Sequence, residues 1–266
     1  MALKFYFLGS GSRGNCTLVE TSRGKFLIDL GFGLKRTNQS LHELGMSMEE
    51  ISVALLTHTH NDHVKNPTLR RMAISNVPLM CRSEHQSKLS GMTGFNYLQD
   101  KELVHFYSDS GFEVLPDVFV EPIALSHDSP ATHGFLFTFK MGTGSFRFAY
   151  IADCGFFSLP LLIEKIQDVD LIALEFNHDE QMEKESGRHP QLIHRVIGPT
   201  GHLSNYNAAK LLNRVKAKNL KSVVQLHLSE ECNLPRLAQE AAGKIIANIP
   251  IHQTAQEKIG PIIEIR

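Results

Sequence analysis

The chain has 266 residues, of which 42% are hydrophobic, and its 27 basic and 28 acidic side chains leave a formal net charge of −1. This length suits one large domain or two small ones with a sizeable core, and the ordinary apolar content excludes an extended disordered chain. Near-neutral charge argues against binding nucleic acid or membrane by bulk charge alone, but it leaves room for a local basic face. The 14 histidines direct attention to metal binding, because histidine is the commonest metal ligand.

The four cysteines lie far apart without a CxxC pair, which argues against a structural zinc site or a small disulfide framework. The apolar run at the N-terminus is shorter than a signal-peptide core. Nothing in the sequence approaches the length of a membrane-spanning helix. We therefore expect a cytoplasmic protein with no membrane partner.

The first half of the chain is expected to form short strands separated by Gly/Ser turns, with two early helices. Strands are predicted over 3–8, 16–20, 25–30 and 51–57, and helices over 34–44 and 66–75. Further strands are predicted over 104–107, 112–116, 118–126, 134–140, 146–153, 170–176 and 222–228, and helices near 159–167, 188–197, 203–218 and 234–247. No linker or repeat divides the chain. We therefore expect a single domain over residues 1–266, with two mixed sheets packed face to face and helices outside.

The most specific motif is THTHNDH at residues 57–63, which follows the buried strand predicted at 51–57. His58 and His60 are two residues apart, so on a strand end their side chains would project to the same side. Asp62 and His63 follow where the chain must turn. Four ligands within six residues cannot all reach one tetrahedral ion comfortably. The motif therefore predicts two neighbouring ions.

Additional metal ligands are available where later strands end. His127, Asp153 and His227 each stand at or near the end of a predicted strand. Asp153 suits a bridging role, because its two carboxylate oxygens can each bind one ion. Taken alone, a strand-end Asp or His is more often a cap or a satisfied polar core residue than a ligand. The THTHNDH motif favours the ligand interpretation.

THTHNDH is the signature of the metallo-β-lactamase superfamily, and the chain resembles that family over essentially its whole length. The resemblance implies an α/β fold, a four-layer αββα sandwich with two mixed sheets and the metal site at one edge. It implies one ion held by His58, His60, His127 and Asp153 and a second held by Asp62, His63, Asp153 and His227. Asp29 is similar to the family's Asp that orients ligands without binding an ion.

A candidate general acid lies in the motif Gly201-His202-Leu203-Ser204-Asn205, directly before a predicted helix. The motif resembles the His-Ser/Thr motif at a helix start in tRNA 3′-processing nucleases of the superfamily, where the histidine donates the leaving-group proton. Glu175 occupies the strand end that corresponds to the acidic residue orienting that histidine. The alternative is that His202 merely caps the helix.

The segments GSGSRGNC, SHD, EFNHD, GHLSN and HLSEECNLP resemble the YycJ/WalJ-type group. Members of that group are DNA 5′→3′ exonucleases linked to mismatch repair. The resemblance implies a dimetal phosphodiesterase in which a metal-bridging hydroxide attacks phosphorus and His202, steered by Glu175, protonates the leaving oxygen. Asp62 is counted among the catalytic residues as well as the ligands. Arg13 and His133 depart from the group's pattern, at positions that bear on substrate selection more than on metal binding.

The metal and the substrate contacts are less constrained by the sequence. Mixed His/carboxylate ligation admits zinc, manganese or iron, with zinc or manganese expected. The Gly-rich loop GSGSRGN could cradle a phosphate through its backbone N–H groups, or it could be a plain tight turn. His178 could contact substrate or be a polar loop residue. The candidate substrate-binding residues are Ser12, Asn15, Asn177, His178 and Ser204.

Charge is segregated along the sequence. Residues 186–229 and 64–83 contain no acidic side chain, whereas 100–128 is strongly acidic. These stretches are either ordinary solvated faces or, since they adjoin proposed site residues, sources of phosphate contacts. The basic side chains are Arg188, Arg195, Lys210, Arg214, Lys216, Lys218 and Lys221 in the first stretch and Lys65, Arg70, Arg71 and Arg82 in the second.

Several alternative functions remain compatible with the sequence. The expected partner is a DNA substrate, but an RNA-processing enzyme or a cyclic-nucleotide phosphodiesterase would use the same site. A thioesterase or lactonase of the glyoxalase II kind would need no His202. A non-catalytic metal-binding or scaffold protein would need no complete ligand set. A homo-oligomer is compatible with the sequence. Other protein partners are unknown from the sequence.

Overall fold

The computed structural model describes residues 3–215 and 219–265, which divide into two compact units. The first unit comprises residues 3–117, 129–131 and 255–265, and the second comprises 118–128 and 132–254 apart from 216–218. The predicted single domain over 1–266 stays a prediction, because this division does not test it. Within the described ranges, no helix combines the length and apolar content that a membrane span requires.

The first unit is built on a mixed sheet with the strand order β14-β1-β2-β3-β4-β5-β6. Strands β14, β1, β2 and β3 pair in antiparallel fashion, and β3 to β6 run parallel. β7 (Phe112–Leu115) follows β6 along the chain. The sheet strands are β1 (Leu3–Gly9), β2 (Cys16–Thr21), β3 (Gly24–Ile28), β4 (Ile51–Leu55), β5 (Leu79–Cys81), β6 (Val104–Phe106) and β14 (Ile262–Ile265).

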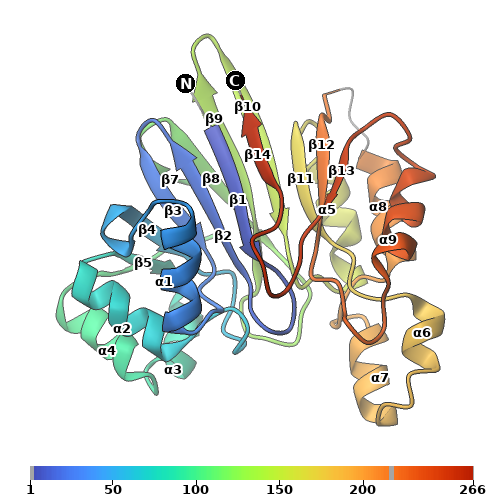
Figure 1. Ribbon diagram of the computed structural model, residues 1–266, viewed down its shortest axis with the longest axis horizontal. Helices are drawn as coiled ribbons and strands as arrows, with labels where there is room; N and C mark the ends of the chain where they lie inside the picture. The colour runs from blue at the N-terminus through green and yellow to red at the C-terminus, as the bar shows by residue number, and fades with distance from the viewer. Residues whose placement is uncertain (1–2, 216–218, 266) are drawn as a thin grey trace. The chain divides into compact units, whose positions relative to one another are not determined.

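Four helices of this unit lie beside its parallel strands (Figure 1). They are α1 (Leu34–Glu43), α2 (Asn66–Ser75), α3 (Gln86–Leu89) and α4 (Thr93–Asp100). Pro67 stands in the first turn of α2, where its missing N–H has no helical partner to lose. Leu41, Met72 and Leu98 from three of the helices join Leu27 of the sheet in one buried cluster. Burying each such side chain contributes about 1.5–3 kcal/mol.

The second unit contains the strand order β13-β12-β11-β10-β9-β8. β8, β9 and β10 form an antiparallel meander, whereas β10, β11, β12 and β13 run parallel. The carboxyl ends of β10, β11 and β12 therefore share one edge of the sheet. The strands are β8 (Val118–Ala124), β9 (His133–Met141), β10 (Gly144–Ile151), β11 (Leu171–Glu175), β12 (Ser222–Leu226) and β13 (Ile251–Gln253).

The second unit's parallel strands are accompanied by α5, α8 and α9, whereas α6 and α7 form a separate pair (Figure 1). Leu162 of α5, Leu211 of α8 and Ala238 of α9 pack with Ile172 and Val223 of the sheet. The helices are α5 (Leu159–Lys165), α6 (Glu180–Lys184), α7 (Pro190–Ile197), α8 (Asn205–Val215) and α9 (Pro235–Gly243).

Two mixed sheets with accompanying helices confirm the predicted α/β class. The expected strand ends need one correction. β4 ends at Leu55, so His58 and His60 lie in the loop beyond the strand and not on its end. The helix predicted over 203–218 is α8, and residues 216–218 fall outside the described ranges. His133, whose role the sequence left open, begins β9 opposite Ala124 and is buried.

Candidate metal centre

In the first unit, the loop after β4 gathers three imidazole rings. The ring centroids of His58 and His60 are 4.7 Å apart, and those of His58 and His63 are 4.0 Å apart. A tight turn brings them together, because the N–H groups of His63 and Val64 both donate to the His60 carbonyl, at 2.9 and 3.1 Å. Asp62 Oδ2 lies 3.7 Å from His63 Nε2. All four residues of the predicted motif are therefore close together.

A buried carboxylate organises this loop from the end of β3. Asp29 Oδ2 lies 2.7 Å from Nδ1 of His63, and Asp29 Oδ1 accepts hydrogen bonds from the N–H and the hydroxyl of Thr57, both at 2.9 Å. Because Nδ1 of His63 faces a carboxylate, Nε2 is the ligand atom that this ring would present to an ion. This contact is the one expected of a residue that orients ligands without binding metal. Thr57 belongs to the same network, and sequence reasoning gave it no role.

Asn15 contacts the same histidine from another loop. It is fully buried, and its Nδ2 lies 2.9 Å from His63 Nε2 and 3.3 Å from the Asp62 carbonyl oxygen. Its Oδ1 accepts hydrogen bonds from the Ser10 hydroxyl and the Gly11 N–H, at 2.8 and 2.9 Å. These partners place Asn15 inside the ligand network, whereas the sequence suggested a substrate contact.

The Gly-rich loop at 9–15 has the geometry of a tight turn. Its N–H groups donate to protein acceptors, with Ser10 donating to the Ala255 carbonyl at 3.1 Å, Arg13 to Gln256 Oε1 at 3.1 Å and Gly14 to the Gly11 carbonyl at 2.8 Å. Because these three N–H groups already have acceptors within the protein, the contacts favour the plain tight turn, and the phosphate cradle stays a prediction. Ser12 is exposed on this turn, and its substrate contact stays a prediction.

In the second unit, four predicted site residues converge at the carboxyl edge of the parallel strands. Ligand atoms of Asp153, Glu175, His202 and His227 all lie within 4.8 Å of one another. Asp153 follows β10, Glu175 ends β11 and His227 follows β12. The parallel pairing of these three strands therefore explains the cluster. His202 joins it from the segment that precedes α8.

Glu175 is the centre of this cluster. Its Oε1 lies 2.7 Å from His202 Nδ1 and 3.0 Å from His227 Nδ1, and its Oε2 accepts the N–H groups of Cys154 and Leu203 at 2.9 and 3.0 Å. Burial alone would raise the pKa of Glu175, but the neighbouring His202 lowers it. Conversely, burial alone would lower the pKa of His202, but the charge of Glu175 raises it. The two side chains therefore form a partly buried pair, in which each stabilises the charged form of the other.

The remaining predicted ligands lie around the same cluster. His127 Nδ1 is 3.0 Å from the Gly201 carbonyl oxygen, which leaves Nε2 as the atom that this ring would present to an ion. The ring centroid of His202 is 5.1 Å from that of His127 and 5.2 Å from that of His227. Nδ1 of His227 is 2.6 Å from Asp153 Oδ1. Gly201 acts through its backbone carbonyl, which no sequence pattern would have identified.

Three site residues adopt a left-handed backbone. Asp29, Asp153 and His227 have φ values of 63°, 47° and 57°, a region that non-glycine residues enter at a cost of about 1–3 kcal/mol. Each residue lies one or two positions beyond the end of a strand. Such conformations concentrate at functional sites, where the surrounding structure holds them in place.

The other predicted substrate contacts are also buried in hydrogen-bond networks. Asn177 Nδ2 donates to the His227 carbonyl at 3.1 Å. The Ser204 hydroxyl donates to Glu180 Oε1 at 3.0 Å and accepts the Asn207 N–H at 3.2 Å, so it caps the start of α8. His178 is 1% exposed and forms a backbone bridge with Ser204, and burial lowers its pKa. A substrate contact by these three residues stays a prediction.

Several cations of the two basic stretches are neutralised by carboxylates. Arg195 pairs with Asp128, Lys221 with Asp170 at 2.9 Å, and Arg188 with both Glu183 and Glu231. Arg71 and Arg82 of the other stretch pair with acidic side chains too. Acidic residues outside each stretch supply these partners. Positive and negative side chains are therefore less separated in space than they are along the sequence. Lys216 and Lys218 lie outside the described residues.

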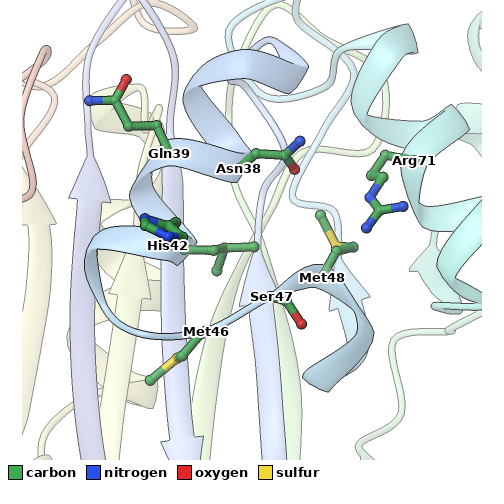
Figure 2. A pocket seen from close by; sticks show the side chains of 8 residues that line it. Asn38, Gln39, His42, Met46, Ser47, Met48 and Arg71 are labelled. Atoms are coloured by element: carbon green, nitrogen blue, oxygen red, sulfur yellow. The ribbon is translucent and has the colours of Figure 1, made fainter.

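A separate pocket of about 390 Å³ lies beside α1 in the first unit. Figure 2 shows Asn38 and His42 on α1, with Arg71 of α2 across from them. Met46 and Met48 contribute thioether side chains. None of the predicted site residues lines this pocket, so it is not part of the candidate metal centre.

Known proteins resemble the chain in sequence and in structure. It is 25% identical to exodeoxyribonuclease WalJ of Streptococcus pneumoniae over an alignment of 275 positions, which covers 100% of this chain and 99% of that protein. It is 27% identical to exodeoxyribonuclease YycJ of Bacillus anthracis over 247 residues, or 92% and 90% of the two chains. The crystal structure of the metallo-beta-lactamase fold protein YhfI from Bacillus subtilis matches 99% of both chains with a TM-score of 0.71 at 14% identity.

A family match agrees with these relatives. Residues 25–227 match the family described as beta-lactamase superfamily domain, a segment that contains every predicted metal ligand. The predicted resemblance is confirmed, as is the prediction of a hydrolase, since relatives along the chain's whole length are named exodeoxyribonucleases. The chain belongs to the beta-lactamase superfamily and has the metallo-β-lactamase fold.

Proposed function

We propose that the chain is a divalent-metal-dependent phosphodiesterase that degrades DNA as a 5′→3′ exonuclease. Two relatives named exodeoxyribonucleases cover nine-tenths or more of the chain, and that name supports DNA as the substrate. The 5′→3′ polarity rests on the motif resemblance alone. A cytoplasmic location is part of the proposal, and the four cysteines, all buried free thiols, support it.

The observation that carries this proposal is the pairing of His202 with Glu175. Breaking a phosphodiester releases an alkoxide, which leaves far more readily when a positioned acid protonates it. Glu175 holds Nδ1 of His202 at 2.7 Å, so the proton would be delivered from Nε2. Both oxygens of Glu175 already accept hydrogen bonds, which supports an orienting role for this carboxylate. Thioester or lactone hydrolysis has less need of such an acid.

We further propose that seven residues hold two divalent ions, zinc or manganese with iron as the alternative. The order of the ligand motifs along the sequence supports one dimetal centre, and the clustering within each unit is compatible with it. When bound, the ions would activate water and neutralise charge on the phosphate. Nδ1 contacts with Asp29 and with the Gly201 carbonyl support Nε2 ligation by two of the histidines. The proposed ligands are His58, His60, Asp62, His63, His127, Asp153 and His227.

Residues around the ligands are proposed as positioning residues. Asp29 and Thr57 fix the ring of His63, and Asn15 limits its movement from the other side. Asn177 fixes the loop of His227 through that residue's carbonyl oxygen. Such contacts raise metal affinity by reducing the freedom of the ligand rings. This positioning role is proposed for Asn15 and Asn177 in addition to the predicted substrate contacts, which stay predictions.

The proposal is tested by digestion of duplex DNA labelled at either its 5′ or its 3′ end, with Mn²⁺ or Zn²⁺ added. We expect nucleotides to be released from the 5′ end. His202→Ala should lower the rate on DNA by about 10²–10⁴-fold with metal content unchanged. The loss should be much smaller with bis(p-nitrophenyl) phosphate, because p-nitrophenolate leaves without a proton. His194→Ala, an exposed histidine of α7, is the matched control and should behave as the wild type.

Other outcomes would assign a different function. Cleavage of RNA or cyclic nucleotides without cleavage of DNA would remove the DNA assignment. Turnover of S-acylglutathione that does not depend on His202 would indicate a thioesterase. Full nuclease activity in His60→Ala would exclude the metal mechanism.

A further inference from the structure

The exposed face of α8 combines an aromatic ring with positive charge. Its opposite face, which includes Ala208, Leu211 and Leu212, is buried in the hydrophobic core of the second unit. Tyr206, Lys210 and Arg214 recur at intervals of four residues, so they line one exposed stripe. Tyr206 is 65% exposed, and the sequence of α8 contains no acidic residue. An exposed tyrosine on a purely basic helix face is not required by packing.

α8 and α9 are neighbours in the fold (Figure 1), and a groove beside the stripe is lined by residues of both helices. Its volume is about 500 Å³, and Tyr206, Lys210 and Asn213 line it on one side, with Lys244 on the other. Among the described residues, Lys210, Arg214 and Lys244 form no ion pair. These cations therefore differ from Arg188, Arg195 and Lys221, which are held by carboxylates.

Two acidic residues also line the groove, but both are engaged elsewhere. The Asp179 carboxylate accepts the N–H groups of Gln181 and Met182 at 3.0 Å, which caps α6. Glu240 lies 3.8 Å from Arg236 on the solvent side of α9. The charged side chains that line the groove itself are balanced, with two lysines and two carboxylates. The positive charge available to an anionic ligand is therefore that of Lys210 and Arg214 on the exposed stripe.

The stripe starts next to the proposed general acid. The N–H of Leu203 and the ring of His202 are both bound to Glu175, and α8 begins two residues later at Asn205. Asn205 is itself fixed by Asn233, whose Oδ1 accepts a hydrogen bond from Asn205 Nδ2 at 2.8 Å. The first turn of α8, with Tyr206, is therefore rigidly connected to His202. A strand following the stripe would continue away from His202 along the helix.

We propose that this stripe and groove bind a single-stranded segment of the DNA substrate, with a base stacked on Tyr206 and backbone phosphates against Lys210 and Arg214. The inference rests on the proposed function, because it assigns the strand-binding surface of that site. Stacking on exposed aromatic rings combined with a basic track is how proteins hold single strands without reading their sequence. The stripe would hold the substrate in place while His202 acts at the scissile phosphate.

Binding of a short single-stranded DNA with phosphorothioate linkages, which resist hydrolysis, tests the inference by fluorescence anisotropy with the full-length protein. We expect Tyr206→Ala to weaken binding by about ten- to a hundredfold, as for other stacked bases. Tyr206→Phe keeps the ring and should bind as the wild type. Lys210→Ala combined with Arg214→Ala should reduce the slope of log affinity against log salt by about 1.4, the value for two phosphates of a single strand.

Lys140→Ala removes an exposed lysine from β9 and is the matched control, expected to leave affinity unchanged. Circular dichroism establishes that each variant is folded. Wild-type affinity in folded Tyr206→Ala would overturn the inference, and so would equal losses in Tyr206→Phe and Tyr206→Ala. Failure of the proposed function has a different signature, namely a wild-type protein that binds the oligonucleotide but does not degrade unmodified DNA.

Discussion

Glu175 contacts two side chains and two backbone groups of the candidate site in the second unit. It binds the rings of His202 and His227 and the backbone at Leu203 and Cys154. A neutral amide of the same shape can accept only on one atom and must donate from the other. The charge and the full set of acceptors are therefore both needed for the two rings to keep their orientation.

The variant Glu175→Gln consequently tests the orienting role of Glu175 while His202 itself is still present. We expect the kcat on DNA to fall by about a hundredfold, the lower end of the contribution of a general acid, with a smaller change in KM. The alkaline limb of the pH profile of kcat should also move to lower pH, because the neutral amide no longer raises the pKa of His202. Steady-state kinetics on labelled DNA measure both. An unchanged profile would show that Glu175 has only a structural role.

At the same scale, the sequence predicted the side chains that carry the chemistry and, by resemblance, the two carboxylates that orient them, Asp29 and Glu175. It did not predict the hydroxyl and carbonyl groups that complete their networks. His58, His63 and Asp153 belong to motifs whose residue types indicate metal binding. Thr57 contributes a hydroxyl to Asp29, and Gly201 contributes a carbonyl oxygen to His127. Neither contact has a sequence signature, because each depends on where the folded backbone places one atom. Positioning residues of this kind are found only from coordinates.

At the scale of elements, the ligand loop of the first unit is held by neighbouring loops. The Asn15 N–H donates to the Asp62 carbonyl at 2.7 Å, and the Leu30 N–H donates to the His63 carbonyl at 2.7 Å. Gly31 allows this close approach, because a Cβ there would lie only 1.8 Å from the Asp62 carbonyl oxygen. A side chain at this position would displace the loop that carries Asp62 and His63.

We expect Gly31→Ala to lower the free energy of unfolding by about 1–3 kcal/mol, the usual cost of overpacking, and to weaken metal binding as well. Gly33→Ala is a matched control two residues away, since a Cβ at Gly33 meets nothing within 4 Å. Urea denaturation and titration with Zn²⁺ against a chelator measure the two effects. Equal behaviour of the two variants would contradict the role given to the close approach at Gly31.

Sequence reasoning missed the helices α3, α4 and α6, and it also missed three strands that are defined by distant partners. β1, β9, β10 and α2 carry their own periodicity or turn residues and were predicted within a few residues of their bounds. β5, β13 and β14 have three or four residues each, too few for a pattern. β14 exists because it pairs with β1 at the other end of the chain, with Lys4 opposite Glu264. Local sequence contains no information about such pairing.

At the scale of the whole molecule, the net charge of −1 conceals local differences that sequence segregation describes only in part. Arg188, Arg195 and Lys221 look like phosphate-binding residues in the sequence, yet carboxylates neutralise them. In the described part of the second unit, the cations that have no carboxylate partner include those of the stripe on α8. A nucleic-acid substrate is therefore compatible with a nearly neutral protein, provided that a few unneutralised cations are placed together.

Metal binding should also be measurable as a change in the thermal stability of the whole chain. Ions that bind only the folded state stabilise it by mass action, by about 2.7 kcal/mol at a concentration one hundred times the dissociation constant. For a protein of this size that corresponds to a rise in Tm of about 5–10 °C. We expect protein stripped with a chelator to melt lower and to regain its Tm when Mn²⁺ or Zn²⁺ is added.

The size of this shift should depend on the ligand histidines and not on histidine content in general. His60→Ala removes one ring from the group around His58 and should reduce the shift, whereas His194→Ala should leave it intact. Differential scanning calorimetry measures the shift, and elemental analysis of the same samples should give two ions per chain for the wild type. A wild-type Tm that does not respond to added metal would contradict the assignment of these residues as ligands, because a site that holds ions only in the folded chain must stabilise that chain.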